Sequence, residues 1–135
     1  MIKVSCAIIR NETGEVLVTQ RSHTMPLPLK WEFPGGKVEP SESAEQSLIR
    51  EINEELTVQI RIIEKLQENV HHYPDKTICL IPFLCEIISG EIQLKEHAAF
   101  LWLKPDKLLM QPDWAEADIP IAENLQSKYG TGVPL

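Results

Sequence analysis

Residues 43–56, SAEQSLIREINEEL, predict an amphipathic helix with two distinct faces. Ser43, followed three residues later by Gln46, is typical of a capping box that satisfies backbone N–H groups in the first turn. At about 100° per residue, one apolar stripe contains Leu48, Ile49, Ile52 and Leu56. About 120° away lie Glu51, Glu54 and Glu55. We therefore expect this helix to bury one face against a sheet and to present carboxylates on the neighbouring face.

Five strand-like runs surround this helix, at residues 2–10, 15–20, 58–68, 77–88 and 98–103. The turn residues 11–14, NETG, predict that the first two runs form a β-hairpin. The segment 21–29 contains two prolines and is expected to be a loop. A second helix is predicted over 119–128. The pattern indicates a mixed or antiparallel sheet with helices packed on it.

Length and charge limit the classes of protein and of partner. The 135 residues fit one domain, 1–135. Thirteen Lys plus Arg against twenty Asp plus Glu give a net charge of −7, which disfavours polymeric nucleic acid and anionic membranes as partners. The chain contains no run near the roughly 20 apolar residues of a membrane helix. A signal-peptide cleavage site is also absent, so we expect a cytoplasmic protein, with monomer and homodimer both open.

The cysteines and histidines show no metal-binding spacing. Cys6, Cys79 and Cys85 lie in apolar stretches without a CxxC pair, which favours buried reduced thiols over disulfides or zinc ligands. The four histidines, including His97, also lack zinc spacing, so surface or loop positions are expected for them.

The glutamate face of the first helix has two interpretations. A solvated acidic face is the ordinary one for a Glu-rich helix. Like charges at i, i+3 and i+4 repel each other, however, and only Arg50 is near enough in sequence to offset them. A divalent cation such as Mg²⁺, shared with substrate phosphates, would remove this repulsion. The preceding residues 31–37, WEFPGGK, predict a short strand that leads into a tight double-glycine turn, where a backbone carbonyl is exposed.

The spacing within residues 36–58 matches a known motif. From Gly36, five residues lead to Glu42 and seven more lead to Arg50, followed by EINEELTV. This resembles the Nudix box, G-x5-E-x7-R-E-U-x-E-E-x-G-U with U aliphatic, of the Nudix hydrolases. The one departure is Thr57, where the family has a glycine that closes the helix in a left-handed conformation. The resemblance implies an α/β fold of the α+β type, an α/β/α sandwich with a mixed sheet between helices.

The resemblance also implies roles for the residues of the box. Glu54 and Glu55 would be metal ligands, Glu51 a ligand or the base that activates water, and the Gly35 carbonyl a backbone ligand. Arg50 would orient the carboxylates, and Glu42 would support the loop. The implied cofactor is Mg²⁺, with Mn²⁺ as a substitute.

Similarity extends along most of the chain and includes the MutT-like branch of the family. It implies phosphate contacts at Arg21, Lys37 and Lys76, with surface charge as the alternative for the lysines. Glu96 would assist the metal or the base, so that the implied catalytic set is Arg50, Glu51, Glu54 and Glu96. Glu123 would contact the base edge, with an exposed or helix-capping role as its alternative. Apolar walls for the base are implied at Phe33 and near Ile8, where ordinary core packing is the alternative.

The implied function is Mg²⁺-dependent hydrolysis of small nucleoside triphosphates to the monophosphate and pyrophosphate. Damaged or modified substrates such as 8-oxo-dGTP are expected first, which would make the enzyme a DNA-repair sanitiser of the nucleotide pool. One alternative is a CTP or 5-substituted dCTP pyrophosphohydrolase, favoured by Glu123. An alternative of another class is a nucleotide-sensing module without turnover. Such modules usually lose carboxylates of the box, whereas this chain retains all of them.

Overall fold

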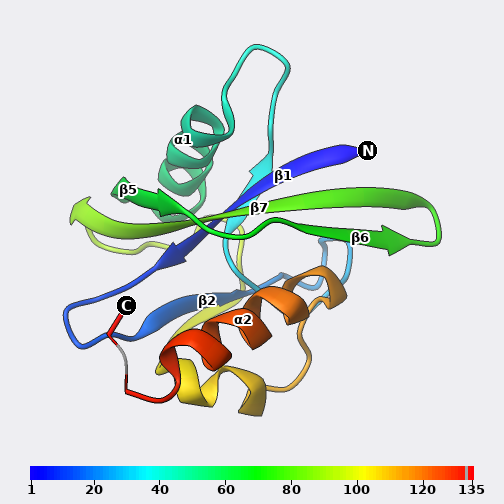
Figure 1. The fold of residues 1–135 in the computed structure, drawn as a ribbon. Helices are drawn as coiled ribbons and strands as arrows, with labels where there is room; N and C mark the ends of the chain where they lie inside the picture. Colours follow the sequence, from blue (N-terminus) through cyan, green and yellow to red (C-terminus); the bar gives the residue numbers. More distant parts are fainter. Residues whose placement is uncertain (133) are drawn as a thin grey trace.

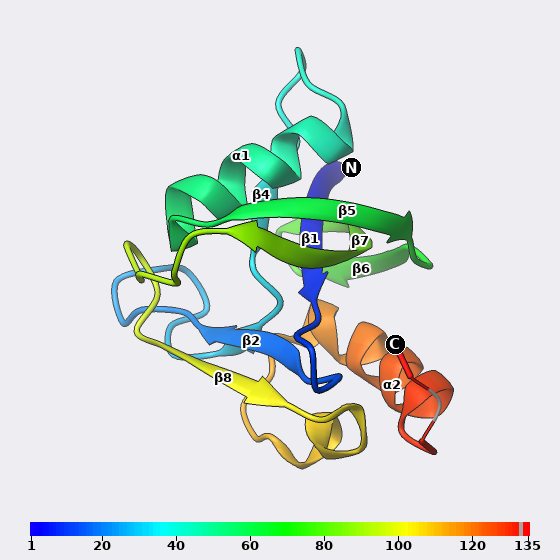
Figure 2. The same cartoon turned by 90° about the vertical axis from the view of Figure 1, so that its left-hand side faces the viewer.

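A computed structural model describes residues 1–132 and 134–135 and shows two sheets and two α-helices in layers (Figure 1). Helix α1 (Ala44–Leu56) covers one face of the larger sheet. The smaller sheet and helix α2 (Ile119–Tyr129) lie on the other side (Figure 2). The predicted arrangement of a mixed sheet between helices is confirmed. None of the described helices is long and apolar enough to span a membrane.

The larger sheet has the strand order β4-β1-β7-β5, and β6 pairs with the other part of the long strand β7. Its strands are β1 (Ile2–Ile9), β4 (Gly35–Lys37), β5 (Gln59–Lys65), β6 (Asn69–Tyr73) and β7 (Lys76–Ser89). The β1–β7 pair is parallel, whereas the β1–β4, β5–β7 and β6–β7 pairs are antiparallel. The sequence predicted strands at β1, β5 and β7 but not at β6.

The smaller sheet is antiparallel and has the order β3-β2-β8. Its strands are β3 (Trp31–Glu32), β2 (Val16–Gln20) and β8 (Ala99–Leu103). Two short 3₁₀ segments, Pro105–Met110 and Glu116–Asp118, connect it to α2. Because β2 is the central strand, residues that follow its end lie close to both of its neighbours.

The predicted hairpin between the first two strands is wrong. The turn forms, with Asn11 Oδ1 accepting the N–H of Glu15 at 2.9 Å. Beyond one isolated bridge between Arg10 and Val16, however, β1 pairs with β4 and β7, and β2 pairs with β3 and β8. Both strands are buried on both faces along most of their length, which is typical of interior strands that need partners on each edge.

Two hydrophobic clusters lie on opposite faces of the larger sheet, and β1 contributes alternate residues to each. Cys6 and Ile8 pack with Phe33, Trp114 and α2, whereas Ala7 and Ile9 pack under α1. This alternation follows from the two-residue period of a strand. The three cysteines are buried and free, as predicted.

Helix α1 begins with the capping box that its sequence predicts. Ser43 Oγ accepts the N–H of Gln46 at 3.1 Å, and the Gln46 side chain accepts the N–H of Ser43 at 3.0 Å. At the other end Thr57 adopts the left-handed conformation, with φ of 61°, that the motif normally assigns to glycine. This conformation costs a β-branched residue about 1 kcal/mol or more. The Thr57 hydroxyl lies 2.6 Å from the Leu56 carbonyl oxygen and 3.1 Å from the Glu91 carbonyl oxygen, and donation to either one offsets part of that cost.

We expect Ser43→Ala to lower the free energy of unfolding by about 1 kcal/mol and the Tm by ~3 °C. The substitution removes the side-chain acceptor that satisfies the Gln46 N–H at the start of α1. Thermal unfolding followed by circular dichroism measures the change. Ser41→Ala is the matched control, since Ser41 is exposed and lies outside the helix. Equal melting temperatures for the two variants would contradict the capping role.

Candidate active site

The carboxylates of α1 face the glycine strand β4. A Cβ atom added at Gly36 would lie 2.5 Å from Cδ of Glu51, and one added at Gly35 would lie 1.9 Å from the Ser5 carbonyl oxygen. Gly35 and Gly36 pair with β1 as strand residues, so the predicted double-glycine turn is wrong. Glycine is required at both positions because β4 passes close to the backbone of β1 on one side and to the Glu51 side chain on the other. A Cβ atom at either position would clash with one of them.

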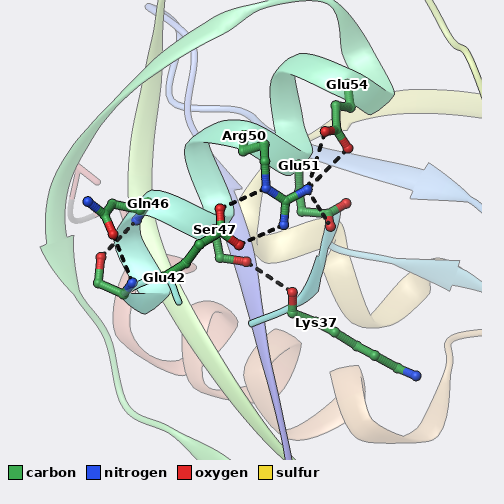
Figure 3. Close-up of polar contacts among 8 residues, drawn as sticks. Lys37, Glu42, Gln46, Ser47, Arg50, Glu51 and Glu54 are labelled. Carbon is green, nitrogen blue, oxygen red and sulfur yellow. Dashed lines mark hydrogen bonds and ion pairs between the residues drawn. The ribbon is translucent and has the colours of Figure 1, made fainter. Parts of the chain in front are cut away.

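Arg50 joins three carboxylates around α1 (Figure 3). Its Nε and Nη2 contact both oxygens of Glu42, at 2.8 and 2.9 Å, in a bidentate pair. Its Nη1 donates to Glu51 at 3.2 Å and to Glu54 at 3.2 Å. This guanidinium lowers the pKa of the Glu42 carboxyl and keeps it charged. Arg50 therefore holds Glu51 at a defined place and connects it to the loop before the helix.

Glu55 is the buried member of this face, with only 5% of its surface exposed. Within the described chain its Oε1 has no hydrogen-bond partner. Burial raises the pKa of Glu55, and the neighbouring carboxylates of Glu51, Glu32 and Glu96 raise the pKa further. We call Glu32, Glu51, Glu55 and Glu96 the acidic cluster. A buried acidic oxygen without a partner is costly unless a cation occupies the site.

Glu55→Gln is expected to raise the free energy of unfolding of the metal-free protein by about 1 kcal/mol or more. The wild-type side chain either buries a charge or takes up a proton beside Glu51, and both cost free energy at neutral pH. Urea unfolding in the presence of chelator measures the difference. Glu54→Gln is the control, because the Glu54 side chain is 57% exposed and its removal changes stability by roughly 0.5 kcal/mol at most. A loss of stability in Glu55→Gln would refute this expectation.

The loop that carries Glu96 is attached to α1 and to β2 by its backbone. Lys95 N–H donates to the Glu55 carbonyl at 3.1 Å, and Ala98 N–H donates to the Gln20 carbonyl at 2.9 Å. Glu96 lies between these two attachments and is exposed. Its charge nevertheless contributes to the raised pKa of Glu55.

Arg21 and His97 meet at Glu32. Arg21 Nη1 lies 2.7 Å from Glu32 Oε1, and His97 Nε2 lies 2.9 Å from Glu32 Oε2. His97 was expected at the surface or in a loop. It lies in a loop, as expected, and its side chain is only 1% exposed. No role was predicted for Glu32, because the residues next to it in the sequence do not indicate that Arg21 and His97 contact its carboxylate.

A second buried carboxyl, Asp118, lies beside Phe33. Asp118 Oδ2 accepts the Phe33 N–H at 2.9 Å, and the Phe33 ring lies 5.1 Å from the Trp114 ring. Burial raises the pKa of Asp118 well above its ordinary value, and the Glu32 charge raises it further. In the sequence, Asp118 lies within the segment 117–123, ADIPIAE. A contact with the base was predicted there for Glu123 but not for Asp118.

The remaining predicted residues lie at varied depths. Ile8 is fully buried in the same core cluster as Phe33. Glu123 is exposed on α2. Lys37 is exposed, with its carbonyl accepting from Ser47 at 3.0 Å, and its ammonium points away from the acidic face of α1 (Figure 3). Lys76 is exposed, with Nζ 6.0 Å from the Tyr73 ring.

The donor set of the acidic cluster fits a hard divalent cation. Carboxylate and carbonyl oxygens are the ligands that Mg²⁺ prefers, and Glu55 Oε1 is an acceptor without a partner in the described part of the chain. Among the described residues, however, no three His, Cys, Asp or Glu side chains are already arranged to hold one ion. A separate open groove of about 990 Å³, lined by Arg10, Trp102 and Tyr129 among others, includes none of the predicted site residues.

Known proteins share the sequence family and the fold of this chain. The NUDIX domain model matches residues 1–125. A CTP pyrophosphohydrolase from Escherichia coli (strain K12) is 37% identical over 123 residues, covering 91% of this chain and 90% of that protein. An 8-oxo-dGTP diphosphatase from the same strain is 33% identical over 102 residues, covering 76% and 79%. The crystal structure of the MutT protein from Methanosarcina mazei Go1 has a TM-score of 0.85 at 27% identity and covers 94% of each chain.

The mixed sheet, with helix α1 on one face and the glycine strand β4 beside that helix, places the chain in the class of α+β domains. Within that class, the chain belongs to the Nudix hydrolase family, as its box predicted. Relatives of the chain include proteins named as diphosphatases and pyrophosphohydrolases of nucleoside triphosphates. Enzymes of this family generally act with a divalent metal ion.

Proposed function

We propose that this chain hydrolyses nucleoside triphosphates to the monophosphate and pyrophosphate, with a damaged or modified base such as 8-oxoguanine in the preferred substrate. The observation that carries the proposal is the acidic cluster, and above all the buried Glu55 oxygen that has no partner in the described residues. Buried carboxylates that crowd one another destabilise a fold, so their retention is best explained by a use in catalysis.

We infer that Glu51, Glu54, Glu55 and Glu96, with the Gly35 carbonyl, hold Mg²⁺ or its substitute Mn²⁺. When bound, the cation screens phosphate charge and lowers the pKa of coordinated water. In this proposal Glu51, whose carboxylate is held by Arg50 Nη1 at 3.2 Å, would take the proton of the attacking water.

The cationic side chains bind and orient the phosphate chain in this proposal. Arg21 lies beside the acidic cluster through its ion pair with Glu32. Lys37 and Lys76 are exposed on strands of the larger sheet, and in this proposal each would have to turn its ammonium toward the phosphate chain to contact it. Arg50 and Glu42 act on the carboxylates rather than on the substrate, because their bidentate pair already uses two of the guanidinium's donor directions.

We infer that the base lies near Phe33 and Asp118. Phe33 and Trp114 supply an aromatic wall, and Asp118 supplies a carboxyl group whose raised pKa allows it to donate as well as accept a hydrogen bond. Glu123 would contact the base from the exposed face of α2. Ile8 is fully buried and would support this wall from behind.

The second candidate is a CTP or 5-substituted dCTP pyrophosphohydrolase. It is favoured by the 37% identity to a protein of that name over 91% of this chain. Steady-state kcat/KM over a panel that contains 8-oxo-dGTP, dGTP, CTP and 5-methyl-dCTP separates the two candidates. Identification of released pyrophosphate rather than orthophosphate tests the reaction itself. A preference for ADP-ribose or dinucleoside polyphosphates over every triphosphate would refute both.

A nucleotide-sensing module without turnover is the rival from another class. It predicts tight binding of a triphosphate with no product under any metal condition. The same panel, run by calorimetry with a nonhydrolysable analogue, distinguishes this rival from an enzyme. The retained glutamates at positions 51, 54 and 55 favour the enzyme.

A further inference from the structure

The buried imidazole of His97 lies at the junction of three strand ends of the smaller sheet. His97 precedes β8 by two residues, and the neighbouring Ala98 N–H donates to the Gln20 carbonyl at 2.9 Å. Glu32 ends β3 on the other side of β2, and Arg21 follows the end of β2 itself. The antiparallel pairing of β2 with β3 and β8 therefore brings these three side chains together from distant parts of the sequence.

The three side chains form one chain of hydrogen bonds. His97 Nε2 is 2.9 Å from Glu32 Oε2, and Glu32 Oε1 accepts from Arg21 Nη1 at 2.7 Å. Each carboxylate oxygen thus has one fixed nitrogen partner. The His97 side chain is 1% exposed and that of Glu32 is 14% exposed, so water competes little for these bonds.

This chain of bonds determines the orientation of the Arg21 guanidinium. Arg21 Nε donates to the Pro26 carbonyl at 2.5 Å and Nη1 donates to Glu32. Nη2 makes no hydrogen bond to any described residue. A guanidinium held at two nitrogens presents its third nitrogen in one direction, which suits a phosphate oxygen. Without His97, one oxygen of Glu32 would lose its partner and the carboxylate could rotate with Arg21.

We propose that His97 is a positioning residue that, through Glu32, holds Arg21 for the phosphate chain of the substrate. The inference rests on the proposed function, in which Arg21 binds that chain. A buried histidine that only filled space would not need its Nε2 within hydrogen-bond distance of a carboxylate that also binds an arginine. His97 acts at a distance from the reacting atoms, so its effect is expected in substrate binding rather than in the chemical step.

The test compares donor-removing and donor-retaining variants. His97→Leu is expected to raise KM for the preferred triphosphate about tenfold while kcat changes about twofold or less. His97→Gln, whose amide nitrogen can occupy the place of Nε2, is expected to stay within about threefold of the wild type in KM. His97→Asn, which is too short to reach Glu32, is the second donor-removing variant if His97→Leu does not fold. His72→Leu, at an exposed histidine on β6, is the control.

A double-mutant cycle identifies the residue through which His97 acts. In an Arg21→Ala background, His97→Leu is expected to add no further increase in KM, because the side chain that it positions is already absent. Full additivity of the two substitutions would overturn the proposal. Equal KM values for His97→Gln and His97→Leu would overturn it as well, since both remove the imidazole but only one removes the donor.

A measurement without substrate separates this inference from the proposed function. The Nε–H resonance of Arg21 in the nucleotide-free protein is expected to shift in His97→Leu and to stay in place in His72→Leu. An unshifted resonance in His97→Leu would refute the coupling, whatever the enzyme hydrolyses. A wild-type protein that hydrolyses no triphosphate, with the shift still present, would refute the proposed function and the phosphate role while leaving the His97–Glu32–Arg21 contact established.

Discussion

Glu51→Gln is expected to lower kcat by on the order of 10² or more while the fold stays intact. The substitution replaces a carboxylate by an amide of nearly equal volume, so Gly36 still provides enough room for it. The amide can accept a hydrogen bond from Arg50 but cannot take a proton from water. Steady-state kinetics at saturating triphosphate and Mg²⁺ measure the effect.

Glu45→Gln is the matched control for this experiment. Glu45 is an exposed carboxylate in the first turn of the same helix, away from the acidic cluster. Its loss changes the charge of α1 by the same amount, so a decrease in kcat confined to Glu51→Gln would not be a general effect of charge. Turnover within twofold of the wild type in Glu51→Gln would refute its role as the base.

Removal of divalent metal with a chelator is expected to abolish turnover, and Mg²⁺ or Mn²⁺ is expected to restore it. The physical reason is the acidic cluster, in which one buried oxygen of Glu55 has no partner among residues 1–132 and 134–135 and the neighbouring carboxylates raise the pKa of Glu55. A bound cation would also stabilise the folded state, so the Tm of the wild type should rise as Mg²⁺ is added.

Glu55→Gln separates metal binding by this cluster from a general effect of salt. The Tm of Glu55→Gln is expected to be insensitive to Mg²⁺, whereas that of Glu45→Gln should rise as in the wild type. Full activity after exhaustive chelation would contradict the metal requirement. An equal rise in Tm for all three proteins would show that the cation binds somewhere else.

Helix α1 illustrates what local sequence can predict. Its cap, its apolar stripe and its length depend on residues within a few turns of each other, and the observed helix, Ala44–Leu56, begins directly after its predicted cap, Ser43. The contacts of Arg50 with Glu42 and Glu51 could also be predicted, because all three residues lie on one helix and the loop directly before it. Thr57 is the one departure from the motif, and one of the two carbonyls that its hydroxyl reaches, that of Glu91, lies outside the helix.

Strand pairing illustrates where local sequence fails. The turn at residues 11–14 is local and was predicted, but β1 pairs with β7 in a register that aligns Ile2 with Ile78. Nothing within the first twenty residues indicates this partner. The double-glycine segment was likewise predicted as a turn, because the strand that requires its glycines, β1, is brought beside it only by folding.

The amino-acid sequence alone determined the class of this protein: the helix, its carboxylates and the family to which the chain belongs. Those features depend on spacing along the chain, which folding does not change. Only the tertiary structure decided which side chains surround the carboxylates, because β2 brings together Arg21, Glu32 and His97 from three separate strand ends. It likewise placed Asp118 against Phe33 and left Glu123 exposed on α2. Burial and distance between remote residues arise from packing, and no local pattern encodes them.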